Sequence, residues 1–202
     1  MLKTKGERTR EAILETAAAL ATQEGLAPLS IGRLAEASGM SKSGLFAHFG
    51  SKEELQLATV DHAAAMFVAE VIAPAREAPR GLPRVWALCD HMIDYTERRV
   101  FPGGCFFAAT SFEFNNRPGP VRDRIAEMMA SWLSYLEHAV EQAREAGEID
   151  PALSAREIAF ELDSLAQGAN AKFQLFREPR VFDEARRAVR DRIESLRPAR
   201  AA

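Results

Sequence analysis

Apolar residues recur at a spacing of three or four positions along most of the chain, which is the spacing of amphipathic helices. The clearest case is 121–144, where apolar residues stand at positions 125, 128, 129, 132, 136, 140 and 143. The aromatic segment 105–114 has strand propensity, but an all-helical context favours a short helix. Proline and glycine separate the segments, and the predicted helices cover about 8–24, 30–38, 41–49, 51–73, 83–99, 105–114, 121–144, 154–176 and 181–196. The pattern predicts an all-α protein of about nine helices, preceded by a basic arm over residues 1–7.

The segment 30–55 carries the strongest local signals. Ser30 is placed to cap a short helix that ends at the Gly39 turn, and Ser41 is placed to cap a second. In the second helix Leu45 and Phe49 are four residues apart and face inward. This leaves small, polar and basic residues towards solvent: Lys42, Ser43, Gly44, Ala47 and His48. Two short helices joined by a glycine turn predict a helix-turn-helix. A capping box from Ser51 to Glu54 then opens a long helix.

The sequence ILETAAALATQEG, followed by SIGRLAEASGMSKSGLFAHFGSKEEL, resembles the N-terminal domain of the TetR family of bacterial transcriptional regulators. Two positions depart from the family pattern: Phe46 stands where Tyr is usual, so a hydroxyl contact to phosphate is missing, and Met40 replaces the usual Val. The resemblance implies contacts to bases or phosphates at Lys42, Ser43 and Gly44, and contacts to the DNA backbone at Arg33, His48 and Lys52. The full set of expected DNA-binding residues is Arg33, Ser41, Lys42, Ser43, Gly44, Phe46, His48 and Lys52.

The same resemblance predicts two domains: a helix-turn-helix DNA-binding domain over 1–50, and a larger helical domain over 51–202 for effector binding and dimerisation. Residues 51–73 would be the connecting helix. Helices 154–176 and 181–196, with their small and apolar residues, are the expected dimer contact. A homodimer is expected because two recognition helices must reach successive major grooves of a palindromic site, about 34 Å apart.

Large, deformable side chains are concentrated in the second domain. Taken singly, each suits an ordinary helical core; taken together, and given the cavity that the resemblance implies, they favour a pocket for a small hydrophobic effector. Asp90, His91, Asp94 and Glu113 are the polar groups that could orient such a ligand or simply be solvated. The expected lining residues are Phe67, Trp86, Cys89, Met92, Cys105, Phe106, Phe112, Met128, Met129 and Trp132.

Composition and charge limit the classes of function that this protein can have. The net charge is -3, but the first 60 residues hold seven basic and seven acidic groups, with the basic ones at the N-terminus and around the helix-turn-helix. The longest stretch without a charged residue, 100–112, is too short for a membrane span, and the basic N-terminus leads into an amphipathic pattern rather than a signal peptide. A cytoplasmic protein is expected. Cys89 and Cys105 do not make a disulfide framework, which leaves open whether either is redox-active, and no metal or cofactor motif is present.

The sequence thus predicts a homodimeric, cytoplasmic repressor that binds double-stranded palindromic DNA and is released by a small apolar effector. It is not expected to be an enzyme, since no phosphate-binding loop, nucleophile elbow or close carboxylate pair is found. Two alternatives stay open: a DNA-binding protein of the same fold without a small-molecule ligand, and a helical enzyme or interaction module that does not bind DNA. The operator, the effector, the regulated genes and a role in activation are not readable from the sequence.

Overall fold

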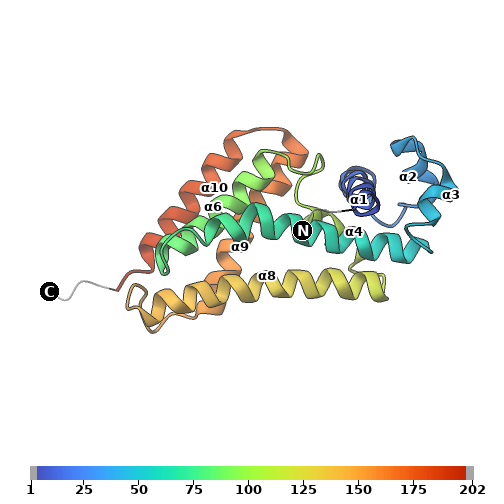
Figure 1. Ribbon diagram of the computed structural model, residues 1–202. Coiled ribbons are helices and arrows are strands. Elements are labelled where there is room, and N and C mark those ends of the chain that lie inside the picture. The colour runs from blue at the N-terminus through green and yellow to red at the C-terminus, as the bar shows by residue number, and fades with distance from the viewer. Residues whose placement is uncertain (1–3, 199–202) are drawn as a thin grey trace. The chain divides into compact units, whose positions relative to one another are not determined.

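The computed structural model describes residues 4–198, and every regular element among them is a helix (Figure 1). One of them, η1, is π-helical and joins α4 to α5 without a break, so the described residues form nine helical segments. This confirms the predicted all-α class. The elements are α1 Lys5–Glu24, α2 Ile31–Ser38, α3 Lys42–Phe46, α4 Lys52–Phe67, η1 Val68–Ile72, α5 Ala73–Ala75, α6 Leu82–Glu97, α7 Phe106–Phe114, α8 Pro120–Glu145, α9 Ala155–Phe176 and α10 Arg180–Ser195.

The chain forms two compact units. The first holds the chain up to Met66 together with Phe101–Met128, and the second holds Phe67–Val100 and the chain from Met129 onward. The first unit therefore contains α7 as well as the N-terminal helices. The functional boundary expected at residue 50 remains a prediction, because compactness alone does not assign function.

Helix α1 supplies the core of the first unit. Its apolar face is buried, with Ile13 2%, Ala17 0% and Ala21 1% exposed, and the alanines allow α2 to pack closely against it. The helix begins at Lys5 rather than near Arg8, because Thr4 and Glu7 form a capping box, in which the Thr4 N–H donates to Glu7 Oε2 over 2.7 Å. The predicted arm is thus partly helical, and its residues 1–3 lie outside the described part of the chain.

The long helix that begins at Lys52 extends past Pro74, where the sequence predicted it to stop at Ala73. The π-helical turns of Val68–Ile72 precede the proline, and the helix continues to Ala75 with Pro74 in the first turn of α5. A proline in a regular α-helix clashes with the carbonyl four residues earlier, and the wider π-helical turn relieves that crowding.

By length and composition, the continuous helix Lys52–Ala75 could cross a membrane. Its apolar residues follow a helical stripe, and Leu55, Val60 and Ala63 on that stripe are fully buried within the protein. Burial of this kind is typical of a core helix in a globular protein.

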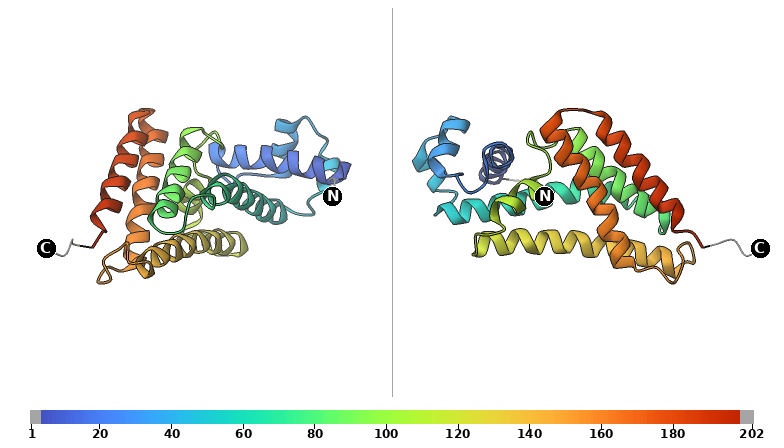
Figure 2. Two further views of the ribbon diagram at one scale, coloured as in Figure 1. Left: turned by 60° about the vertical axis from the view of Figure 1, so that its left-hand side comes forward. Right: turned by 180° about the vertical axis from the view of Figure 1, so that it is seen from behind.

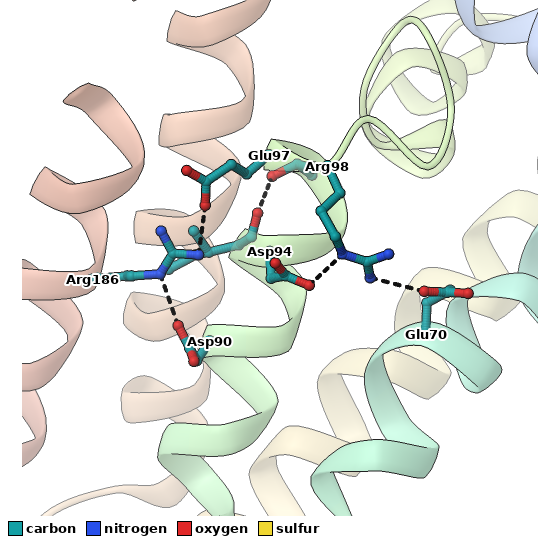
Figure 3. Close-up of polar contacts among 8 residues, drawn as sticks. Glu70, Asp90, Asp94, Glu97, Arg98 and Arg186 are labelled. Carbon is teal, nitrogen blue, oxygen red and sulfur yellow. Dashed lines mark hydrogen bonds and ion pairs between the residues drawn. The ribbon is translucent and has the colours of Figure 1, made fainter. Parts of the chain in front are cut away.

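In the second unit α6, α9 and α10 lie side by side, as both views in Figure 2 show. Two arginines tie α6 to its neighbours (Figure 3). Arg186 of α10 lies 2.8 Å from Asp90 and 2.7 Å from Glu97 of α6. Arg98, at the end of α6, lies 2.6 Å from Asp94 and 2.8 Å from Glu70 in η1. The ion pairs with Arg98 therefore attach the π-helical part of the connecting helix to α6.

Candidate nucleic-acid interface and effector site

The predicted helix-turn-helix is present, and its caps are the predicted ones. Ser30 Oγ accepts a hydrogen bond from the Arg33 N–H over 3.2 Å, and Ser41 Oγ accepts one from the Gly44 N–H over 3.1 Å. Gly39 ends α2 in the left-handed region with φ 67°, a conformation that favours glycine. The helix α3 is shorter than predicted and ends at Phe46, although Phe49 beyond it is still buried.

Burial of Leu45 at 0% and Phe49 at 1% fixes which side of α3 faces outward. Lys42, Ser43 and Phe46 are exposed, and Phe46 is 55% exposed although it is a large apolar residue. Gly44 and His48 are half-buried. The Lys42 side chain lies beside Gly32 of α2, where an added Cβ would be 3.7 Å from Lys42 Cε. The outer surface of α3 is thus polar and basic, with one aromatic ring.

The hydroxyl of Ser41 is already engaged in the free protein. Besides capping α3, Ser41 Oγ lies 3.2 Å from Ser43 Oγ in a hydrogen bond. A hydroxyl has one donor and two acceptor positions, so Ser41 keeps only part of its capacity for a DNA phosphate.

Arg33 forms an ion pair with Glu24, which the sequence analysis did not predict. Its Nε donates to Glu24 Oε2 over 2.8 Å and its Nη2 donates to Glu24 Oε1 over 2.5 Å. The hydrogen bond with Arg33 lowers the pKa of Glu24, and the same bond raises the pKa of Arg33. Arg33 therefore contacts a DNA backbone only by sharing or leaving Glu24.

Replacing Glu24 by Gln is expected to tighten DNA binding about two- to fivefold, because it removes the closer of the two carboxylates paired with Arg33 and leaves only Glu36, at 3.9 Å. Fluorescence anisotropy with an operator duplex would measure the change. The gain should disappear in an Arg33→Gln background. A gain of equal size in that background would show that the effect comes from the lower negative charge of the protein and not from Arg33.

Lys52 is exposed and is the first residue of α4. The start of a helix carries a partial positive charge, so a lysine there adds to a surface that attracts phosphate. Ser51 caps the helix by accepting from the Glu54 N–H over 3.0 Å. The second half of the predicted capping box differs: Glu54 Oε2 accepts from the Gly50 N–H over 2.8 Å, one residue before Ser51.

In the loop between α1 and α2, both backbone N–H groups and a backbone carbonyl group form hydrogen bonds with side chains of other helices. Glu113 of α7 accepts hydrogen bonds from the N–H groups of Leu26 and Ala27 over 2.7 and 2.9 Å. Gln56 of α4 donates its amide to the Leu26 carbonyl over 2.7 Å. We call this arrangement the loop clamp. Glu113 thus binds backbone amides within the first unit, whereas the sequence analysis placed it among the groups that could orient a ligand.

Two of the predicted effector-site residues, Phe67 and Trp132, lie together in an aromatic cluster of the second unit. The Phe67 ring contacts the Tyr95 ring edge-on at 5.6 Å between centroids, and contacts the Trp132 ring at 5.0 Å. Trp132 Nε1 donates to Asp163 Oδ1 of α9 over 2.8 Å. Burial raises the pKa of Asp163, and the hydrogen bond from Trp132 opposes that rise. Residues of α4, α6 and α8 therefore meet in this cluster, and Trp132 links it to the half-buried carboxyl group of Asp163 in α9.

The other expected lining residues are divided between the two units. Cys105, Phe106, Phe112 and Met128 belong to the first unit, where the Phe106 ring packs against Phe101 and Phe107. Phe112 is 79% exposed and joins no part of the buried core. Within the second unit, Cys89 and Met92 are buried, Met129 is half-buried, and Trp86 lies under the Arg190 guanidinium at 4.8 Å.

The polar groups differ from those expected. Asp90 and Asp94 are paired with Arg186 and Arg98, so neither is available to orient a ligand without breaking an ion pair. The carboxyl group beside the aromatic cluster is that of the half-buried Asp163, which the sequence pattern did not single out. Its only signal was a carboxylate between Leu162 and Leu165 on an otherwise apolar face.

Replacing Asp163 by Asn should raise the thermal stability of the protein, and the gain should grow as pH rises from the ordinary aspartate pKa through the raised pKa of Asp163. The folded state raises the pKa of Asp163, so stability associated with its protonated form is lost as pH rises through that pKa. Asn keeps an oxygen that accepts from Trp132 but never ionises. Melting curves at several pH values would measure this, with the exposed Asp191→Asn as control. A pH-independent difference would contradict it.

Burial raises the pKa of Cys89 to about 12, with the charges of Asp163 and Asp90 contributing. The reactive form of cysteine is the thiolate, so Cys89 is held as an unreactive thiol near neutral pH. Across residues 4–198 no group of three or more His, Cys, Asp and Glu side chains is placed to hold a metal ion.

The all-helical fold, with a helix-turn-helix in its first unit, defines a protein of the helix-turn-helix regulator class. Residues 13–59 match the family described as bacterial regulatory proteins, tetR family, and residues 81–189 match the tetracyclin repressor-like C-terminal domain. The second match alone spans more than half of the chain. The chain belongs to the TetR family of bacterial transcriptional regulators.

Solved structures agree with this assignment. A TetR regulator from Chloroflexus aurantiacus is 27% identical with a TM-score of 0.88, covering 96% of this chain and 99% of its own. One from Cytophaga hutchinsonii is 23% identical with a TM-score of 0.85, covering 99% and 100%. AibR, solved with isovaleryl coenzyme A and operator DNA, is 23% identical with a TM-score of 0.71, covering 94% and 98%. No curated protein gives a significant sequence match.

Proposed function

We propose that this protein is a cytoplasmic, homodimeric repressor that binds a palindromic operator through α3 and leaves it when a small apolar effector binds the second unit. The observation that carries the DNA-binding half is the exposed basic and polar surface of α3 on a capped, buried helix-turn-helix. Side chains of this kind reach phosphates and base edges in a major groove.

The expected DNA contacts divide by chemistry. Lys42 and Lys52 are exposed cations suited to phosphate, and Ser43 and His48 offer hydrogen bonds. Phe46 offers its exposed ring for apolar contact, for example with a thymine methyl group. Ser41 and Arg33 have partners in the free protein, so we assign them secondary roles.

The proposed effector site is the aromatic cluster of Phe67, Tyr95 and Trp132 with Asp163. Large rings with one polar group beside them are typical of a site for a mostly apolar ligand. The helix Lys52–Ala75 contributes Phe67 to the cluster and Gln56 to the loop clamp. A ligand that displaces Phe67 would therefore act on the helix that holds the loop entering α2. AibR, of the same fold, was solved with both an acyl thioester and operator DNA.

The effector half can be tested with Trp132 as a reporter. The chain has two tryptophans, so a Trp86→Phe variant leaves Trp132 as the only one. An apolar compound that binds the cluster should quench this fluorescence and release labelled operator over the same concentration range. A ligand releases DNA only to the extent that it prefers the non-binding conformation. Saturation of the fluorescence change with unaltered operator affinity, for every compound that binds, would contradict the release mechanism.

A further inference from the structure

A second pocket in the second unit has a chemistry unlike that of the aromatic cluster. It has a volume of about 340 Å³, and its lining residues contain three arginines and no carboxylate. Arg76, Arg80 and Arg84 come from the end of α5, the following turn and the start of α6. Residues of α8 complete the lining: Tyr135, His138, Ala139 and Gln142.

Two of the three guanidinium groups are positioned by neutral partners. Arg76 Nε donates to Tyr135 Oη over 3.0 Å, and its guanidinium lies 5.5 Å from the centre of the Tyr135 ring. Arg84 donates to the Ala78 carbonyl over 3.1 Å from Nε and over 2.7 Å from Nη2, and to the Arg76 carbonyl over 2.9 Å. Hydrogen bonds to carbonyl and hydroxyl oxygens orient these cations without neutralising them.

Several arginines elsewhere in the protein are instead paired with carboxylates. Arg33, Arg98, Arg124, Arg186 and Arg192 each pair with at least one carboxylate. Among residues 4–198, no ion pair joins Arg76, Arg80 or Arg84 to an acidic side chain. Arg76 and Arg80 are exposed, and all three arginines line the pocket. The pocket thus gathers three positive charges that the protein itself leaves without a carboxylate partner.

We propose that this pocket binds a phosphate-type oxyanion, either as a free ion or as the phosphate group of a small molecule. The planar guanidinium fork matches the geometry of phosphate oxygens and forms strong charge-assisted hydrogen bonds with them. Arginines that are already oriented lose less conformational freedom on binding, which favours affinity. A volume of about 340 Å³ is within the range of small-molecule sites, about 300–1,000 Å³.

The site has a direct connection to the long helix. Arg76 is the C-terminal cap residue of α5, which ends the continuous helix Lys52–Ala75. An anion shared by Arg76 and the residues of α8 would tie the end of this helix to α8. This goes beyond the proposed apolar effector, and the anion site does not depend on DNA binding or on the aromatic cluster.

Isothermal titration calorimetry of the full chain with pyrophosphate tests the proposal, in chloride buffer of constant ionic strength without other phosphate or sulfate. Saturable binding at one site per chain is expected. Arg80→Gln should weaken it at least tenfold, and Arg76→Gln should weaken it as well. The control is Arg156→Gln, an exposed arginine outside the pocket with the same change of charge, which should stay within twofold of the wild type.

Two further titrations identify the source of the anion. Binding of orthophosphate that glycerol 3-phosphate displaces would support an organic phosphate as ligand, and binding without displacement would support the free ion. No saturable binding of any of these probes would overturn the proposal. An equal loss of affinity in Arg80→Gln and Arg156→Gln would also overturn it, because it would reflect the overall charge of the protein.

Discussion

Gly103→Ala is expected to destabilise the protein by roughly 3 kcal/mol, the upper part of the range for inserting an atom into a packed site. A Cβ added at Gly103 would lie 1.8 Å from the carbonyl oxygen of Thr22 and 2.4 Å from its carbonyl carbon. Both are backbone atoms of α1, so no flexible side chain can move aside. The turn before α7 would have to leave α1, losing the hydrogen bond from the Gly103 N–H to Thr22 Oγ1, 3.2 Å long in the wild type.

Thermal unfolding followed by circular dichroism would measure this as a fall in Tm of about 6–12 °C for a chain of this size. Gly6→Ala is the matched control: Gly6 lies in α1 of the same unit, and a Cβ there meets nothing within 4 Å. Alanine favours a helix more than glycine does, so Gly6→Ala should leave stability unchanged or raise it by up to about 1 kcal/mol. An unchanged Tm in Gly103→Ala would show that the turn does not pack against α1 as described.

Lys42→Gln is expected to weaken operator binding about 10–100-fold, as for the loss of a charge-assisted hydrogen bond to phosphate. Lys42 is exposed at the start of α3, and no carboxylate among the described residues forms an ion pair with it. A homodimer would lose two phosphate contacts. The slope of log affinity against log salt concentration should therefore become shallower by about two, since each contact contributes about 0.9.

Mobility shift or anisotropy at several salt concentrations would give both quantities. Lys42→Arg keeps the charge and should retain most of the affinity, and the exposed Lys172→Gln in α9 serves as the charge-matched control. If Lys42→Gln lowered affinity with an unchanged salt slope, Lys42 would not contact phosphate. If Lys172→Gln had the same effect, the overall charge and not the α3 surface would determine binding.

The helix-turn-helix could be predicted in detail because its signals are local. A serine three residues before the amide it caps, a glycine at the end of α2 and an apolar pair four residues apart each act within one turn of helix. Ser30, Ser41, Gly39 and Leu45 accordingly take the predicted positions.

The contacts that the sequence analysis did not predict join residues that are far apart in the chain. Glu113 and Leu26 are 87 positions apart, and nothing near either residue indicates that a carboxylate will accept from that loop. Likewise, the pairing of Glu24 with Arg33 depends on how α1 and α2 pack. The helix continues past Pro74 because a π-helical turn precedes this residue, whereas a proline in a sequence normally predicts that a helix ends.

The residues of the proposed effector site could be predicted only in part for the same reason. A sequence rich in aromatic and sulfur-containing residues predicts large buried side chains, but it does not show which of these side chains contact one another. Phe67 and Trp132 do meet, whereas Phe112 is exposed and Phe106 belongs to the other unit. Asp163 was missed because a single carboxylate on a helix is usually solvated, and its partial burial beside Trp132 of α8 depends on the tertiary fold.

Selection of DNA from a random-sequence duplex library by the full-length protein tests the central claim most directly, because the operator sequence itself emerges from the selection. Enrichment of a palindromic site with two half-sites about one helical turn apart, or a multiple of it, is predicted. A Lys42→Gln, Lys52→Gln double variant should fail to enrich it. Recovery of no common sequence by the wild-type protein, or of the same sequence equally well by the double variant, would contradict the assignment of α3 and the start of α4 as the DNA-reading surface.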